Sequence, residues 1–220
     1  MLKKVSSVVK KIIHPSEGFS SKNYWESRYN QGGNSGAGSY DHLAVFKAEV
    51  LNQLFKENGL TSVIEFGCGD GNQLGMLECP SYTGLDVSAT AIQRCKTTYA
   101  ADSTKNFFLY DHRCFVDNRG IFKMDCSLSL DVLYHLVEKE VYDSYLRHLF
   151  ASASKMVVIY AADIAIEHPT AHELYRKFTK DVEKDIKGWK LKTTIKNKYP
   201  AKNNDDQEGS LADFFIYVPA

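Results

Sequence analysis

The 220-residue sequence predicts an α/β protein with a doubly wound, mostly parallel seven-stranded sheet and an antiparallel last strand. The first supporting observation is that short runs of β-branched and aromatic residues alternate with longer segments of helical periodicity. The second is a glycine-rich turn at 67–71, which follows one such run and precedes a helical segment. The third is that the runs 191–195 and 213–218 have no helix between them, which predicts an antiparallel pair.

The composition is that of one soluble domain. Hydrophobic residues make up 44% and charged residues 25%, and we expect a helical and lid segment at 1–40 followed by one domain at 41–220. Lysine plus arginine equals aspartate plus glutamate, 27 each, which argues against a nucleic-acid partner. Five cysteines without a C-x-x-C pair indicate neither a disulfide framework nor a zinc site, and they favour the cytoplasm. No apolar run is long enough to span a bilayer, so no integral membrane association is expected; the oligomeric state stays open.

The N-terminal segment contains three expected features. Residues 1–13 have apolar side chains at helical spacing with lysines between them, which predicts a basic amphipathic helix. Such a helix packs on protein or lies on an anionic membrane surface, and we favour packing. A short helix is expected at 23–29, where Asn23 and Glu26 have the spacing of a capping box, followed by a mobile glycine-rich loop at 31–39.

The remaining elements follow from periodicity and from residues that begin or end helices. Asp41 is expected to cap a helix that Gly59 ends, and Pro169 is expected to open a long helix that reaches Lys187. Between these two we expect helices at 71–77, 88–99 and 138–151, and strands at 62–66, 82–85, 107–110, 126–130 and 156–160. In a sheet wound this way, ligands bind beyond the carboxyl ends of the strands.

The strongest chemical signal is the segment 63–71, VIEFGCGDG, in which a strand is followed by three glycines at alternate positions. Gly67, Gly69 and Gly71 allow a tight turn and let a ligand approach the backbone where no Cβ intervenes. A second acid, Asp86, ends the next strand 19 residues after Gly67, the placement at which a carboxylate accepts the two hydroxyls of a ribose. The order strand, glycine turn, helix, strand and acid predicts a nucleoside-binding site.

These residues resemble the first two motifs of the class I S-adenosylmethionine (SAM)-dependent methyltransferases, whose G-x-G-x-G spacing they share. The resemblance implies SAM as the cofactor, with the glycine turn, including Cys68, against its methionine part. It further implies that Glu65 orders the turn and that Asp86, followed by Val87, holds the ribose.

Two further strand ends complete the predicted site. By the same resemblance, Asp111 meets the adenine amino group with His112 beside it; a helix cap or turn residue is the other interpretation of Asp111. The family's fourth motif, here 125–138, lies between the methyl donor and the acceptor, and it contains Asp131 and His135. We interpret both as catalytic candidates, with His135 as the general base because imidazole takes a proton near neutral pH. The alternative is that His135 only lines the cofactor pocket.

The N-terminal segment is also expected to contribute to the site. In similar enzymes an aromatic and arginine-containing segment closes over SAM. This resemblance implies Arg28 and Tyr29 at the cofactor, Tyr24 and Tyr40 at the substrate, and 32–39 as a lid. The alternative for Tyr24 is that it anchors the N-terminal helix.

A second acceptor segment follows the fifth strand. Tyr160 ends this strand, and His168, His172 and Arg176 lie in the expected long helix, the last two in a basic stripe. Such a stripe binds a phosphate or carboxylate of an anionic small-molecule acceptor, or it is the solvated face of the helix. We expect no metal, because Pro169 makes a helical pair of His168 and His172 awkward.

The segments NYWESRY, GGNSGAGS, DVLYHLVE and DFFIY resemble methyltransferases of bacterial surface-polysaccharide (capsule or O-antigen) biosynthesis clusters. This resemblance implies O-methylation of a small sugar- or phosphate-containing acceptor. Fold and cofactor do not determine the substrate, so two rivals stay open. One is a non-catalytic SAM-binding partner of another enzyme, and the other is a nicotinamide oxidoreductase, which the absence of a Tyr-x-x-x-Lys pair disfavours.

Overall fold

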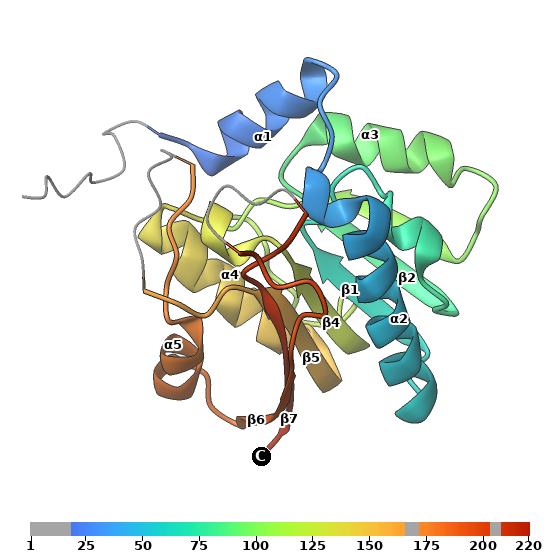
Figure 1. The fold of residues 1–220 in the computed structure, drawn as a ribbon. Helices are drawn as coiled ribbons and strands as arrows, with labels where there is room; N and C mark the ends of the chain where they lie inside the picture. The colour runs from blue at the N-terminus through green and yellow to red at the C-terminus, as the bar shows by residue number, and fades with distance from the viewer. Residues whose placement is uncertain (1–18, 166–171, 203–207) are drawn as a thin grey trace, which may run out of the picture.

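The computed structural model describes residues 19–165, 172–202 and 208–220. The helix expected at 1–13 and the candidate residue His168 lie outside these ranges. A seven-stranded sheet forms the centre of the molecule, in the order β3-β2-β1-β4-β5-β7-β6 (Figure 1). Its strands are β1 (Ser62–Phe66), β2 (Ser81–Asp86), β3 (Lys105–Leu109), β4 (Met124–Leu130), β5 (Ala153–Ala161), β6 (Trp189–Ile195) and β7 (Asp213–Pro219).

The pairing of the strands confirms the predicted topology. Strands β1 to β5 pair with one another in parallel, whereas β7 runs antiparallel to both of its neighbours, β5 and β6. In the central register Glu65 of β1 lies opposite Gly84 of β2 and Leu128 of β4. The carboxyl ends of these three strands therefore meet at one edge of the sheet, where the winding changes direction.

Helices cover both faces of the sheet (Figure 1). The helices α2 (Asp41–Glu57) and α3 (Ala89–Thr98) pack on one face, and α4 (Lys139–Ala151) and α5 (Phe178–Asp185) pack on the other. Adjacent residues of a strand point to opposite faces, so Val63 is buried with α2 and Ile64 with α4. None of the helices in the described ranges is both long and apolar enough to cross a membrane.

The helix α1 (Ser21–Asn30) begins differently from the prediction. Its N-cap is Ser20, whose hydroxyl accepts the backbone N–H of Asn23 at 3.3 Å, so the predicted capping box of Asn23 and Glu26 is wrong. Instead, the Glu26 carboxylate accepts the hydroxyls of Ser88 at 2.6 Å and Thr90 at 2.7 Å, at the start of α3. A carboxylate is favourable at a helix N-terminus, and this contact fixes α1 above the strand ends.

Short helical turns complete the connections. They are η1 (Ala37–Ser39), η2 (Gln73–Met76) and η3 (Leu133–His135), and η2 occupies most of the predicted helix at 71–77. Helix α2 begins at Asp41 and ends at Glu57, two residues before Gly59; its N-cap is Tyr40, so the predicted cap at Asp41 is wrong. The predicted boundaries are therefore displaced by one to a few residues, as is usual for helix ends.

The long helix predicted at 169–187 is wrong over its described N-terminal half. Residues 173–177 have no helical structure, and α5 begins only at Phe178. The backbone N–H of Leu174 donates to the Tyr134 carbonyl at 2.7 Å, and the Arg176 guanidinium donates to the carbonyls of Leu136 and Val137 at 2.7 and 2.9 Å. These tertiary hydrogen bonds hold the segment against η3, so its helical periodicity is overridden.

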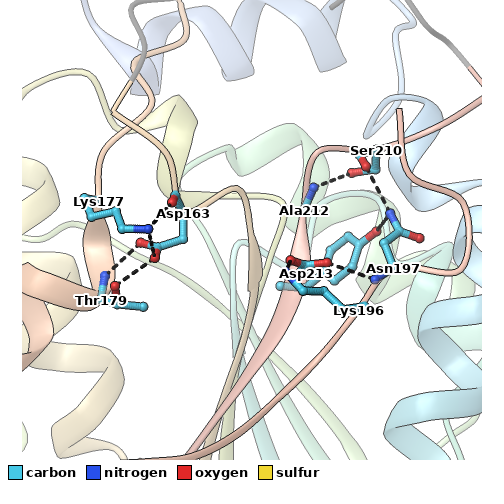
Figure 2. A network of polar contacts seen from close by, with 9 residues as sticks. Asp163, Lys177, Thr179, Lys196, Asn197, Ser210, Ala212 and Asp213 are labelled. Carbon is cyan, nitrogen blue, oxygen red and sulfur yellow. Dashed lines mark hydrogen bonds and ion pairs between the residues drawn. The ribbon is translucent and has the colours of Figure 1, made fainter. Parts of the chain in front are cut away.

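Two carboxylates at the same edge of the sheet, Asp163 after β5 and Asp213 at the start of β7, anchor the neighbouring segments (Figure 2). Asp163, just after β5, accepts the N–H and hydroxyl of Thr179 at 3.0 and 2.8 Å, and the Lys177 ammonium lies 3.0 Å away. Asp213, at the start of β7, accepts the Asn197 N–H at 2.9 Å and the Lys196 ammonium at 2.7 Å. The connections that border the strand ends are thereby fixed to the sheet.

Candidate active site

A cavity of about 410 Å³ opens beyond the carboxyl ends of β1, β2 and β4. Its roof is formed by α1 and the loop that follows it, including Trp25, Tyr29 and Ser35. The sequence-predicted residues that line it are Tyr29, Glu65, Gly67, Cys68, Gly69, Asp86, Val87, Asp111, His112, Asp131 and His135. The strand order and the glycine turn therefore bring most of the predicted cofactor residues and both catalytic candidates to one place.

The glycine turn is shaped by close packing against the protein itself. Gly67 and Gly69 have φ angles of 83° and 57°, in the region that glycine occupies without strain. A Cβ at Gly67 would lie 2.5 Å from a methyl group of Val132, and one at Gly69 would lie 2.2 Å from the Ser35 hydroxyl. Gly71, which was also predicted to contact the cofactor, lies outside the cavity lining, and a Cβ there would lie 3.0 Å from the Cys95 sulfur.

Two buried carboxyl groups stand at the ends of the central strands. Asp86 accepts the backbone N–H of Gly69 at 2.9 Å and that of Ser88 at 2.8 Å, so it joins the glycine turn to the start of α3. Burial nevertheless raises the pKa of Asp86 to about 6. Burial also raises the pKa of Glu65 to about 7, although the Tyr82 hydroxyl donates to it at 2.6 Å and the Lys47 ammonium favours its charged form.

The third acid of the series, Asp111, has a different environment. The Arg113 guanidinium donates to its two carboxylate oxygens at 3.0 and 2.7 Å and holds the pKa of Asp111 well below its usual range. The Lys22 ammonium lies 3.6 Å away. Asp111 is therefore ionised and oriented at the far end of the cavity from Asp131.

One buried polar atom in the cavity wall has no hydrogen-bond partner. Gln73, at the start of η2, is 5% exposed, and its amide nitrogen donates to the Ala44 carbonyl at 3.1 Å. Its amide oxygen, Oε1, accepts no hydrogen bond although water does not reach it. A buried acceptor without a donor costs free energy, which a bound group with an N–H or O–H would recover. Gln73 was not predicted from the sequence, because it lies inside a segment with the pattern of an ordinary helix.

The loop predicted as a lid is tied directly to the glycine turn. The Ser35 N–H donates to the Asp70 carboxylate at 2.9 Å, the Asp70 N–H donates to the Ser35 hydroxyl at 3.1 Å, and Tyr29 bonds the same hydroxyl. Tyr40 also donates to Asp70, at 2.9 Å, so it anchors the loop and is not in the cavity lining. Arg28 donates to the Asn34 carbonyl at 2.7 Å and likewise shapes the loop from outside the cavity.

The end of β4 contains a buried ion pair that the sequence did not suggest. Lys47 of α2 is 0% exposed in its side chain, and its ammonium lies 2.7 Å from the Asp131 carboxylate. Asp131 has a φ of 58° and also accepts the Tyr134 hydroxyl at 3.0 Å. The predicted substrate residue Tyr160 is buried beneath this pair, with its ring centre 5.3 Å from the ammonium and its hydroxyl bonded to Asn197. A lysine in an amphipathic helix gives no sign of its burial, so Lys47 was missed.

A second cavity of about 200 Å³ lies on the other side of Asp131. Asp131 lines both cavities, and Tyr134, Glu173 and Tyr175 form one wall of the second. The rings of Tyr134 and Tyr175 are stacked with their centres 5.2 Å apart. The site therefore offers a larger space at the glycine turn and a smaller one next to Asp131.

The environment of His135 keeps its imidazole uncharged. The ring packs against the edge of Trp25 at 4.9 Å and against Tyr134 at 4.5 Å, between ring centres. Burial lowers the pKa of His135 to about 4. Its Nδ1 lies 3.3 Å from the His172 carbonyl oxygen, so Nδ1 carries the proton of the neutral ring and Nε2 carries the lone pair.

The remaining predicted acceptor residues lie around this histidine and outside the larger cavity. Tyr24 stacks on His172 with ring centres 4.6 Å apart, which joins α1 to the segment after β5. Arg176 is held by main-chain carbonyls and by the Tyr142 ring, 4.4 Å from its guanidinium carbon. The basic helical stripe predicted from His172 and Arg176 therefore does not form.

Comparisons with known proteins bear on the fold. No protein-family model and no curated protein matches the sequence. Among solved structures, N-methyltransferase NodS from Bradyrhizobium japonicum, in complex with S-adenosyl-L-homocysteine (SAH), has a TM-score of 0.68 at 15% identity, over 90% of this chain and 98% of that chain. Magnesium protoporphyrin IX methyltransferase ChlM from Synechocystis PCC 6803, with bound SAH, has a TM-score of 0.63 at 13% identity, over 90% and 98%.

The methyltransferase domain of bacterial CtHen1-C has a lower TM-score, 0.57, at 20% identity, over 79% of this chain and 97% of that chain. These three structures are similar to the chain in fold at 13–20% sequence identity. The described residues therefore have the mostly parallel, seven-stranded Rossmann-like methyltransferase fold that the sequence predicted.

Proposed function

We propose that the protein is a SAM-dependent methyltransferase. The observation that carries the proposal is the cavity itself, in which the glycine turn, the buried Asp86 and Gln73 line one space of about 410 Å³. Similarity to methyltransferases crystallised with SAH supports the same conclusion at the level of the fold.

The residues of the cavity fit this cofactor. Asp86 would accept hydroxyls of the ribose, and Asp111 would accept the adenine amino group. When bound, SAM supplies an electrophilic methyl group on its sulfonium. The protein has to hold the acceptor in line with this methyl group, exclude water and remove a proton from the acceptor.

We place the acceptor at the boundary of the two cavities, next to Asp131 and His135. Asp131 is engaged by Lys47 and Tyr134, so His135 is the better candidate to take the acceptor proton through its Nε2 lone pair. The small second cavity fits an acceptor of about one sugar ring. O-methylation of a small sugar- or phosphate-containing acceptor, as the polysaccharide resemblance implies, is the acceptor class that we propose. A non-catalytic SAM-binding partner would have the same cofactor cavity, and turnover with an acceptor separates the two.

Substitution of Asp86 tests the cofactor assignment. We expect Asp86→Ala to weaken SAH binding by about 1.5–3 kcal/mol, roughly 10- to 150-fold in Kd, because a charge-assisted acceptor for two hydroxyls is lost. The measurement is isothermal titration with SAH, and with NAD, which we expect not to bind. The matched control is Asp102→Ala, a partly exposed acid outside the cavity lining, whose carboxylate bonds Thr104 and lies 3.9 Å from the Lys105 ammonium. Unchanged SAH affinity in a folded Asp86→Ala protein would remove Asp86 from the cofactor site.

The raised pKa values of Asp86 and Glu65 predict a pH dependence of cofactor binding. Hydroxyl and ammonium donors favour ionised carboxylates, so SAH affinity should increase as pH rises through about 6 to 7 and then level off. Folded-state pKa values above those of the unfolded chain mean that the unliganded protein binds more protons when folded. The contribution of Asp86 and Glu65 to its stability should therefore fall as pH rises from about 4 through about 7, whereas the lowered pKa of His135 acts in the opposite direction. Titrations between pH 5 and pH 8 measure both effects, and an Asp86→Asn variant with the same pH dependence would contradict the assignment to Asp86.

A further inference from the structure

Three side chains that ligate metals converge at the boundary of the two cavities. His135, His172 and Glu173 each offer one ligand atom, and these atoms all lie within 4.8 Å of one another. His135 lines the larger cavity and Glu173 lines the smaller one. Across the residues that the structure places, no other group of three or more such side chains comes together in this way.

The two segments that carry these side chains are fixed to each other by main-chain hydrogen bonds. The Leu174 N–H donates to the Tyr134 carbonyl at 2.7 Å. Leu174 is next to Glu173 in the chain, and Tyr134 is next to His135. Arg176 donates to two carbonyls that follow His135 in the chain. Because the backbones on both sides are held, the three ligands are brought together before any ion binds, which lowers the entropic cost of binding.

Both imidazole rings are also held in place by aromatic neighbours. Tyr24 stacks on His172 with ring centres 4.6 Å apart, and Trp25 packs against His135 at 4.9 Å. The Nδ1 of His135 faces the His172 carbonyl oxygen, which leaves Nε2 as the electron-pair donor. A hydrogen bond from the other ring nitrogen to a carbonyl is the usual support of a metal-bound histidine.

We propose that His135, His172 and Glu173 bind one divalent transition-metal ion, with Zn²⁺ as the ion that best matches two imidazoles and a carboxylate. Three protein ligands leave a coordination position open for another oxygen. With bonds of about 2.0–2.1 Å, ligand atoms on a tetrahedral ion are roughly 3.3 Å apart. The ligand atoms here lie within 4.8 Å of one another, so the longest of these distances has to shorten by at most about 1.5 Å. The two imidazole rings are nearly parallel, at 8°, so binding turns one of them toward the shared ion.

This site revises the expectation from sequence that no metal is involved. That argument concerned His168 and His172, which are close in the chain, whereas His135 and Glu173 come together only through the fold. If the protein is a methyltransferase, as proposed above, the ion would activate the acceptor hydroxyl. An acceptor hydroxyl bound at the open position has a lowered pKa, its O–H bond breaks, and its proton leaves to water. The electron pair of this oxygen then forms the bond to the methyl carbon as the carbon–sulfur bond breaks, and His135 serves as a ligand and not as the base.

The test is metal binding by the full-length protein after removal of metals with a chelator. Titration with Co²⁺, followed by its visible absorption, and calorimetry with Zn²⁺ should both show one equivalent bound. Glu173→Gln, which keeps the size of the side chain, and His172→Ala should each weaken Zn²⁺ binding by roughly 100-fold. His148→Ala is the control. His148 lies on α4, bonds the Tyr110 hydroxyl and is not part of the cluster.

SAH affinity of the same samples separates this inference from the proposed function. Tight Zn²⁺ binding that depends on Glu173, with SAH affinity unchanged in Glu173→Gln, supports the site. Equal Zn²⁺ affinity in the wild type and Glu173→Gln, or no stoichiometric Zn²⁺ binding, would reject the metal site. If the same protein binds SAH, the methyltransferase proposal is retained. Zn²⁺ binding by a protein that does not bind SAH would keep the metal site and reject its role in methyl transfer.

Discussion

Replacement of His135 by alanine should lower the rate of methyl transfer by roughly 10²–10⁴-fold and leave SAH affinity nearly unchanged. The expectation follows from its position: it lines the larger cavity, it is neutral, and its Nε2 lone pair is available beside Asp131. The loss is expected whether the imidazole takes the acceptor proton directly or holds an ion that activates the acceptor. Single-turnover transfer of labelled methyl groups from SAM to a fractionated small-molecule extract measures it.

The matched variant for this prediction is His135→Asn. An asparagine amide keeps a donor near the position of Nδ1, and therefore the bond to the His172 carbonyl, but it does not accept a proton at neutral pH. Both variants should be inactive if His135 acts on the acceptor. Wild-type turnover in His135→Asn, together with low turnover in His135→Ala, would instead assign His135 to lining and support of the site.

The strand ends of the site could be predicted from the sequence because each depends on local features. The glycine turn, Asp86 and Asp111 follow short apolar runs, and parallel strands place their carboxyl ends at one edge of the sheet. The fold class and the antiparallel last strand are confirmed for that reason, and Gly67, Gly69, Asp86 and Asp111 line one cavity. The residues that bind cofactor and acceptor stay predictions until binding is measured.

Other parts of the site depend on contacts between segments distant in the chain. The helix expected at 169–187 does not form where Leu174 and Arg176 donate to main-chain carbonyls of the segment after β4. The periodicity of 169–187 carries no information about these carbonyls. The acceptor role predicted for Tyr160 rested on its place at a strand end, yet its ring is 1% exposed beneath Lys47. Gln73 and Lys47 are polar residues of ordinary helical segments whose burial comes only from tertiary packing.

Replacement of Lys47 by methionine should destabilise the protein by about 3 kcal/mol, within the range for removing one partner of a buried ion pair. Methionine fills a similar volume, so the loss arises chiefly from the Asp131 carboxylate, which is left 13% exposed with only the Tyr134 hydroxyl as a donor. The favourable contact of the ammonium with the Tyr160 ring is lost as well. Urea unfolding followed by circular dichroism measures the change in the free energy of unfolding.

The double variant Lys47→Met/Asp131→Asn identifies the cause of that loss. Asparagine tolerates the positive φ of 58° at this position and still accepts the Tyr134 hydroxyl, but it leaves no uncompensated charge beside the cavities. Most of the stability lost in Lys47→Met should therefore return in the double variant, giving a coupling energy of at least about 1.5 kcal/mol. A Lys47→Met protein as stable as the wild type, or a double variant no more stable than the single one, would mean that the charge of Lys47 does not stabilise Asp131.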